Sequence, residues 1–200
     1  MPLSFGVTWD YRCPFARNIH DHLIEGLLGG AGWDVRFVPF CLGQVHLAET
    51  EPDIWERPDD DSGLLALQAG VYVRDHHPDR FLAVHRELFD ARHLHGLRLR
   101  DPEVVAGVLD RAGLDWAAVL EAIGNGAVLP VVRAEHESAA ASHQVWGVPT
   151  FLVGERATFV RLMNDSGGDA ELATRTIERI VALVAGWPEL NELKHTSLDR

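Results

Sequence analysis

The sequence predicts an α/β protein in which a long helical segment interrupts one sheet-containing domain. A strand–helix–strand pattern fills the first 44 residues, and a hairpin followed by a helix fills the last part of the chain. Only helical patterns lie between them. We therefore expect a discontinuous domain of residues 1–44 and 146–190, an all-helical insertion over residues 45–145, and a C-terminal tail over residues 191–200.

The N-terminal unit is predicted from its periodicity. Apolar residues at every second position indicate a strand over residues 3–9, and apolar residues at every fourth position then indicate a helix. Pro14 suits the first helical position because its φ is already fixed near the helical value. A second alternating strand follows over residues 33–37 and closes at Pro39, as an edge strand allows. The two strands of such a unit run parallel, so Cys13 and residues 39–43 should lie at the same edge of the sheet.

The insertion opens with an acidic, proline-bearing loop over residues 51–62 and continues as helices. Asp101 and Asp115 are placed as N-caps of two of them. The five expected helices cover residues 64–71, 81–89, 102–109, 115–124 and 128–143. No strand pattern and no internal repeat interrupts this stretch.

The last section returns to strands. Residues 150–153 and 157–162 have strand patterns, and the short Gly154-Glu155 connection makes them an antiparallel hairpin. Residues 166–169 then open a final helix, and Gly186 ends it.

Composition excludes several classes of function. A formal charge of −12 argues against nucleic acid as a partner, because phosphate backbones are bound by clustered Lys and Arg. No apolar run approaches the length of a membrane span, and the chain enters its first strand without a secretory leader, so we expect a cytoplasmic protein without a membrane partner. The eleven histidines lack the spacing of a defined metal site and are expected mostly on polar helix faces, so no metal is predicted.

Cys13 is the main candidate for chemistry. It occupies the expected N-cap of the first helix, where unpaired amides and the helix dipole favour a thiolate. Comparable sites lower a cysteine pKa from about 8.5 to roughly 3.5 to 7.5. Arg12 and Arg17 could add to this effect, whereas Asp10 would oppose it by raising the thiol pKa. The alternative interpretation is a small buried apolar residue near a turn.

Two separated motifs resemble those of a known redox family. Cys13-Pro14-Phe15-Ala16 at the strand–helix junction and Gly147-Val148-Pro149-Thr150 before the hairpin are similar to the active-site motif and the proline loop of the DsbA-like branch of the thioredoxin fold. The resemblance implies a mixed four-stranded βαβ…ββα core sheet with a large helical insertion. It also implies that Pro149 is cis, that the backbone of Val148 pairs with an extended substrate, and that Cys13, Pro14, Val148 and Pro149 form the catalytic group.

Ala16 departs from the family pattern, because it replaces the second cysteine that normally resolves a mixed disulfide by exchange. Three routes remain open. Cys13 could exchange with a low-molecular-weight thiol such as mycothiol or glutathione, Cys41 could serve as a distant resolving thiol, or Cys13 could have lost redox activity. We expect a thiol oxidoreductase in which the Cys13 thiolate attacks a disulfide or an electrophile and a small thiol resolves the adduct. Cys41 is the weaker candidate and is more simply a buried packing residue.

The 2-hydroxychromene-2-carboxylate isomerases and kappa-class glutathione transferases share this fold and bind a thiol cofactor beside the residue at the Cys13 position. The resemblance to them implies a thiol-cofactor-dependent isomerase or transferase as the alternative function, and a non-catalytic binding protein as the second alternative. The residues expected to border the small thiol are Arg12, Ala16, Thr150, Asn164 and Asp165. Asp165 could instead cap a turn.

The expected partners follow from these alternatives. No cofactor is expected to be tightly bound. The expected partners are a small-molecule thiol and either a small electrophile or a protein disulfide, and a homodimer is a further candidate. A mycothiol-dependent actinobacterial member of the family would fit these features.

Overall fold

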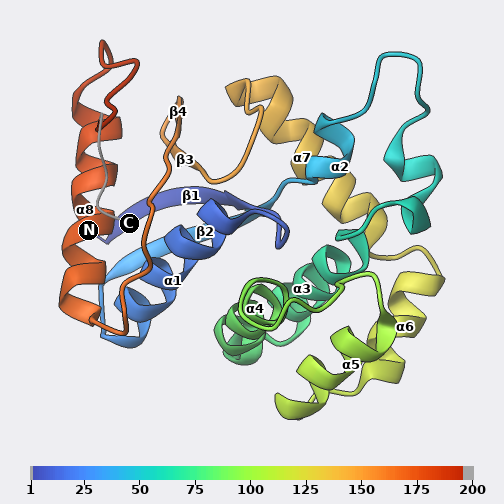
Figure 1. Cartoon of the computed structure of the whole chain (residues 1–200). Helices are drawn as coiled ribbons and strands as arrows, with labels where there is room; N and C mark the ends of the chain where they lie inside the picture. Colours follow the sequence, from blue (N-terminus) through green and yellow to red (C-terminus); the bar gives the residue numbers. More distant parts are fainter. Residues whose placement is uncertain (1, 196–200) are drawn as a thin grey trace.

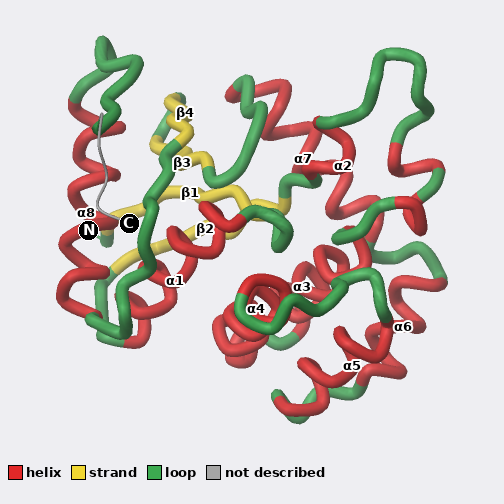
Figure 2. The backbone as a smooth tube through the Cα atoms, in the orientation of Figure 1, coloured by secondary structure: helices red, strands yellow, loops and turns green. Residues whose placement is uncertain are grey.

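The computed structural model describes residues 2–195 and has a four-stranded mixed sheet at its centre. The strand order is β2-β1-β3-β4, with β1 parallel to β2 and antiparallel to β3, and β3 antiparallel to β4 (Figure 2). The strands are β1 (Leu3–Trp9), β2 (Trp33–Pro39), β3 (Thr150–Val153) and β4 (Arg156–Phe159). This topology confirms the predicted fold class.

The central strand β1 is buried on both faces over its second half, although its sequence alternates between apolar and small or polar residues. On the face that Phe5, Val7 and Trp9 do not occupy, this half of β1 carries only a glycine, Gly6, and the small side chain of Thr8. A Cβ at Gly6 would lie 3.3 Å from the Leu152 side chain, so glycine permits the close approach of β3. Pro39 pairs at the end of β2, which is the free edge of the sheet.

Helices α1 (Pro14–Leu28) and α8 (Ala170–Gly186) pack side by side against the sheet, and α7 (Leu129–His143) packs against β2 (Figure 1). Asp169 caps α8 by accepting a hydrogen bond from the Leu172 N–H at 2.9 Å. The start of α1 at Pro14 and the N-cap of α8 at Asp169 therefore agree with the start signals in the sequence.

The segment between β2 and α7 is helical and lies beyond the carboxyl ends of β1 and β2 (Figure 1). It joins the rest of the fold through α4, which packs on both α1 and α3, and the buried apolar side chains of the whole chain form one cluster. Its elements are α2 (Leu42–Val45), the 3₁₀ turns η1 (Ile54–Glu56) and η2 (Pro58–Asp60), α3 (Leu64–His76), α4 (Pro78–His93), α5 (Pro102–Arg111) and α6 (Trp116–Gly124).

Some local predictions were wrong. The loop predicted over residues 51–62 contains two 3₁₀ turns, and the short helix α2 was not predicted. The last strand ends at Phe159 rather than at residue 162. The Val160 N–H still donates to the Pro149 carbonyl, and the chain then runs to α1, where Asn18 Nδ2 donates to the Leu162 carbonyl at 2.9 Å. Of the predicted tail over residues 191–200, residues 196–200 lie outside the described part of the chain.

Within residues 2–195, no single helix is both long and apolar enough to cross a membrane. Helices α6 and α7 are long and apolar enough only when they are taken together, and the chain bends by 69° at the break between them.

Candidate active site around Cys13

Cys13 lies where the chain turns from β1 into α1, and its backbone is held there by the turn. The Cys13 N–H donates to the Asp10 carbonyl at 3.1 Å, and Pro14 takes the first helical position. The Cys13 sulfur caps the helix by accepting a hydrogen bond from the Ala16 N–H at 3.4 Å. The predicted N-cap is therefore the observed one.

The proline loop closes over the same sulfur. The Val148–Pro149 peptide bond is cis, and the Cys13 thiol donates to the Val148 carbonyl at 3.3 Å. Thr150 fixes this loop on β1, because its N–H donates to Thr8 Oγ1 at 2.9 Å and its hydroxyl donates to the Gly147 carbonyl at 2.8 Å. The fold thus brings the two separated sequence motifs into contact.

The electrostatics of Cys13 differ from the sequence-based expectation. Burial raises the pKa of the Cys13 thiol above its ordinary value, and this effect exceeds the lowering by the Ala16 and Phe15 amides. Asp10 raises the pKa further, and Arg161 lowers it. Because the side chain is only 8% exposed, the helix terminus does not make up for the lost solvation of a thiolate. The surroundings of Cys13 therefore favour the neutral thiol over the thiolate.

The two arginines predicted to stabilise a thiolate are already paired. Arg12 lies between two buried carboxylates, at 3.0 Å from Asp10 and 3.0 Å from Asp61. Arg17 lies 3.1 Å from Asp90 and 3.1 Å from Asp165. The expectation that Arg12 and Arg17 lower the pKa of Cys13 is therefore corrected. The cation that lowers this pKa is Arg161.

Asp10 organises the turn before Cys13. Its carboxylate accepts the Arg12 N–H at 2.8 Å and the Leu42 N–H at 2.8 Å, and it is 1% exposed. The second bond ties the Cys13 turn to the start of α2, so the segment after β2 does meet the end of β1, as the parallel topology requires.

Cys41 lies on the other side of this carboxylate, at the N-cap of α2, and is fully buried. Burial raises its pKa to about 12, and the charges of Asp10 and Asp61 add to the effect. Both cysteines are free thiols. A thiol held protonated in this way is a poor resolving nucleophile, so the geometry favours the packing role for Cys41.

The predicted cofactor residues Asn164 and Asp165 lie alongside α1, where Asp165 meets Arg17 and the Asn164 backbone meets His22. Asp165 pairs with Arg17 and also accepts the Gly167 N–H at 3.2 Å, which is the turn-capping role considered from the sequence. The following residue, Ser166, donates to Asp21 through both its N–H and its hydroxyl. A ligand at Asp165 would therefore have to share this carboxylate with Arg17.

The histidines were expected mostly on polar helix faces, but four of the eleven are buried: His20, His22, His85 and His136. Two of them form a directional chain of hydrogen bonds with Tyr11. His20 Nε2 lies 3.2 Å from the Thr8 carbonyl, His20 Nδ1 lies 2.9 Å from His85 Nε2, and His85 Nδ1 lies 2.8 Å from the Tyr11 hydroxyl.

The direction of this chain follows from its acceptor end. A carbonyl can only accept, so His20 Nε2 carries the proton, and burial lowers the pKa of His20 to about 3, which keeps its Nδ1 unprotonated. His85 Nε2 must then donate to that atom, and the Tyr11 hydroxyl must donate to His85 Nδ1. Tyr11 precedes Cys13 by two residues, and its carbonyl lies 2.9 Å from His93 Nε2 of α4. No spacing in the sequence signals this chain.

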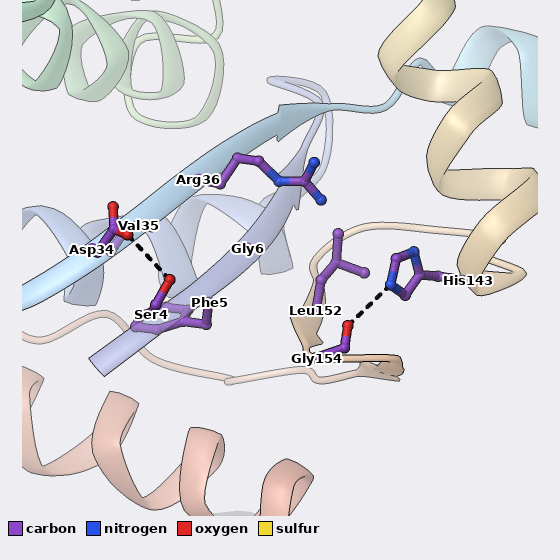
Figure 3. Close-up of a pocket in the computed structure, with 9 residues that line it drawn as sticks. All are labelled: Ser4, Phe5, Gly6, Asp34, Val35, Arg36, His143, Leu152 and Gly154. Atoms are coloured by element: carbon purple, nitrogen blue, oxygen red, sulfur yellow. Dashed lines mark hydrogen bonds between the residues drawn. The ribbon is translucent and has the colours of Figure 1, made fainter. Parts of the chain in front are cut away.

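A separate hollow lies on the sheet face opposite α1. It has a volume of about 560 Å³ and is lined by residues 4–6 of β1, residues 34–36 of β2, Leu152 of β3 and Gly154 after it, together with His143 at the end of α7 (Figure 3). Ser4 donates to Asp34 at one end, and His143 Nε2 lies 3.3 Å from the Gly154 carbonyl at the other. Neither Cys13 nor Pro149 lines it, so this groove is separate from the thiol.

Solved structures with the same architecture share little sequence with this chain. Reduced DsbA1 from Neisseria meningitidis superposes with a TM-score of 0.58 at 18% identity, covering 92% of this chain and 84% of its own. A 2-hydroxychromene-2-carboxylate isomerase gives 0.60 at 16% identity, with 92% and 98% covered. A linker-deletion variant of ScsC from Proteus mirabilis gives 0.61 at 16% identity, with 92% and 69% covered. These likenesses establish the thioredoxin-like fold.

No curated protein sequence matches the chain. A family model does match it, over residues 57–166. The matched stretch is more than half of the chain and contains the cis-proline loop together with most of the helical insertion. On this match the chain belongs to the family of DSBA-like thioredoxin domains.

Proposed function

We propose that this chain is a single-cysteine thiol oxidoreductase, in which Cys13 exchanges with a disulfide and a low-molecular-weight thiol completes the cycle. The observation that supports the proposal is the position of the Cys13 sulfur, between the first amides of α1 and the Val148 carbonyl that precedes cis-Pro149. A substrate backbone or thiol could replace Cys13 as the partner of that carbonyl. Ala16 supplies no second thiol, and Cys41 is buried and protonated.

The proposed exchange has two steps. The Cys13 thiolate attacks one sulfur of a disulfide R–S–S–R′, which forms Cys13–S–S–R and releases R′–S⁻. The thiolate of mycothiol or glutathione, R″–S⁻, then attacks the R sulfur. Cys13 leaves as the thiolate, and the mixed disulfide R–S–S–R″ is released. Cys13 returns to its starting state, the R′ half of the original disulfide is released as a reduced thiolate, and the small thiol is oxidised into the new disulfide in its place.

The raised pKa of Cys13 gives this exchange a particular character. Strong oxidants of the family stabilise their reduced thiolate, which drives the disulfide to react. Cys13 lacks that stabilisation and is a poor leaving group, so its mixed disulfide should be long-lived. The proposed centre is therefore a weak oxidant that retains its adduct until a small thiol removes it.

The test is intact-mass spectrometry of the reduced protein after equilibration with glutathione disulfide or mycothiol disulfide. We expect one adduct, at Cys13, which is absent in Cys13→Ser and retained in Cys41→Ala. The rate of alkylation of Cys13 should rise with pH up to a midpoint above that of a free cysteine. An adduct confined to Cys41, or no adduct at all, would contradict the proposal.

A thiol-cofactor-dependent isomerase or transferase is the second candidate, and the raised pKa of Cys13 favours it. A neutral Cys13 thiol could donate a hydrogen bond to the sulfur of a bound cofactor without forming a covalent bond. This function predicts reversible binding of glutathione or mycothiol that survives in part in Cys13→Ser, measured by calorimetry. A non-catalytic binding protein, the third candidate, would show neither the adduct nor thiol binding.

A further inference from the structure

Arg161 lies in a segment that is fastened to both sides of the Cys13 site. On one side, the Val160 N–H donates to the Pro149 carbonyl at 3.1 Å. On the other, Asn18 of α1 donates to the Leu162 carbonyl at 2.9 Å. Arg161 therefore stands between the cis-proline loop and the first turns of α1, which are the two walls that meet at the sulfur.

The side chain of Arg161 packs on aromatic rings from both of these walls. Its guanidinium carbon lies 5.2 Å from the ring centre of Phe15, two residues after Cys13, and 5.8 Å from that of Phe159. Phe159 packs on Trp146 with ring centres 4.7 Å apart. We call Phe15, Phe159 and Trp146 the aromatic row. Trp146 is 65% exposed, so its end of the row is open to solvent.

Within the described part of the chain, no ion pair neutralises the positive charge of Arg161. Among residues 2–195 its guanidinium has no ion-pair partner within 4.0 Å and no side-chain hydrogen bond, in contrast to Arg12 and Arg17. Glu192 lies close enough for Arg161 to contribute to the lowering of its pKa, but Glu192 is paired with Lys194 at 2.8 Å. A chain with a net charge of −12 repels anions at long range, so an anionic ligand needs a local cation of this kind.

We infer that Arg161 and the aromatic row select a carboxylate-bearing thiol or disulfide as the reaction partner of Cys13. The guanidinium would bind the carboxylate, and the row would cover the apolar part of the same molecule. This inference rests on the proposed function and narrows its cosubstrate, because glutathione carries two carboxylates and mycothiol carries none. Arg161 is thus a specificity residue rather than a catalytic one.

The test compares three small disulfides that differ mainly in charge: 3,3′-dithiodipropionate, 2-hydroxyethyl disulfide and cystamine. We expect Cys13 adducts to form fastest with the dianion and slowest with the dication. In Arg161→Gln, the ratio of the dianion rate to the neutral rate should fall roughly fivefold, and Arg161→Lys should restore part of it. The ratio is the readout because loss of Arg161 also raises the thiol pKa, which slows all three reactions alike. Arg175→Gln, an exposed arginine on α8, is the matched control.

A second readout separates this inference from the proposed function. Iodoacetate and iodoacetamide both alkylate a thiol without any exchange step, and only the former is an anion. Arg161→Gln should lower the iodoacetate-to-iodoacetamide rate ratio at Cys13, whereas Arg175→Gln should not. If no disulfide reacts but this ratio falls, exchange is refuted and the anion preference stands. Ratios equal to the wild-type values in Arg161→Gln, for both reagent sets, overturn the inference.

Discussion

Acidification from pH 8 to pH 5 should destabilise the fold by about 4 kcal/mol through two buried histidines alone. Burial lowers the pKa of His20 to about 3 and that of His136 to about 4, whereas the unfolded chain titrates near 6.5. Below pH 6.5 the unfolded state therefore binds more protons than the folded state, so stability falls as the pH falls. At pH 5 the difference is about 2 kcal/mol for each histidine.

His85 adds to this effect in the same direction, because burial and the neighbouring His20 and Arg74 lower its pKa well below the ordinary value. The charges of Glu137 and Asp10 raise the pKa of His136, but burial lowers it by more. Because whole domains are stable by only about 5–15 kcal/mol, a loss of this size should be readily measurable.

His136→Phe isolates one part of the loss. The His136 ring stacks on Phe40 at 4.2 Å between centres, and its Nδ1 has no partner in the described structure. A phenyl ring should keep the stacking, remove the unpaired nitrogen and abolish the titration. The pH 8 to pH 5 difference in the free energy of unfolding should then shrink by about 2 kcal/mol.

The assay is urea unfolding followed by tryptophan fluorescence at both pH values, with the exposed His95→Gln as the control. A wild-type protein that is equally stable at pH 5 and pH 8 would show that these histidines do not stay neutral in the fold. An unchanged difference in His136→Phe would show that His136 has no part in it.

Two further substitutions test the polar contacts around the Cys13 turn by urea unfolding at pH 8. Tyr11→Phe should cost about 1–3 kcal/mol, because His85 Nδ1 then lacks its buried donor; an unchanged free energy of unfolding would show that this hydrogen bond does not contribute to stability. Arg12→Met should cost about 3–5 kcal/mol, because it leaves Asp10 and Asp61 buried without a cation. Adding Asp61→Asn should recover part of that loss, and strictly additive losses would refute the pairing.

Local signals in the sequence were sufficient for most of the framework. Period-2 alternation located β1 and β2, and Pro14 fixed the start of α1 because the missing N–H is tolerated only there. These features depend on neighbours in the chain, which the sequence displays directly. The end of β4 was misplaced because a contact with Asn18 on α1, far away in the sequence, holds Leu162 against that helix.

The charge state of Cys13 could not be obtained in this way. The sequence places the sulfur at a helix N-terminus, which lowers its pKa, but it does not reveal how far the proline loop and the insertion bury it. It likewise shows two arginines beside Cys13 without showing that Asp61, Asp90 and Asp165 neutralise them. The net effect is a difference between opposing contributions, and most of them come from distant segments.

The buried histidines were misjudged for the same reason, and they show how the insertion bears on the site. His85 belongs to α4 and connects Tyr11, in the Cys13 turn, with His20 of α1. His20 in turn meets the carbonyl of Thr8, whose hydroxyl holds the cis-proline loop. His85 of the insertion thus connects the turn before Cys13 with the residues that hold the cis-proline loop. Without α4, the Tyr11 hydroxyl and His20 Nδ1 would each lose a buried partner, so the helical segment supports the geometry of the turn that carries Cys13.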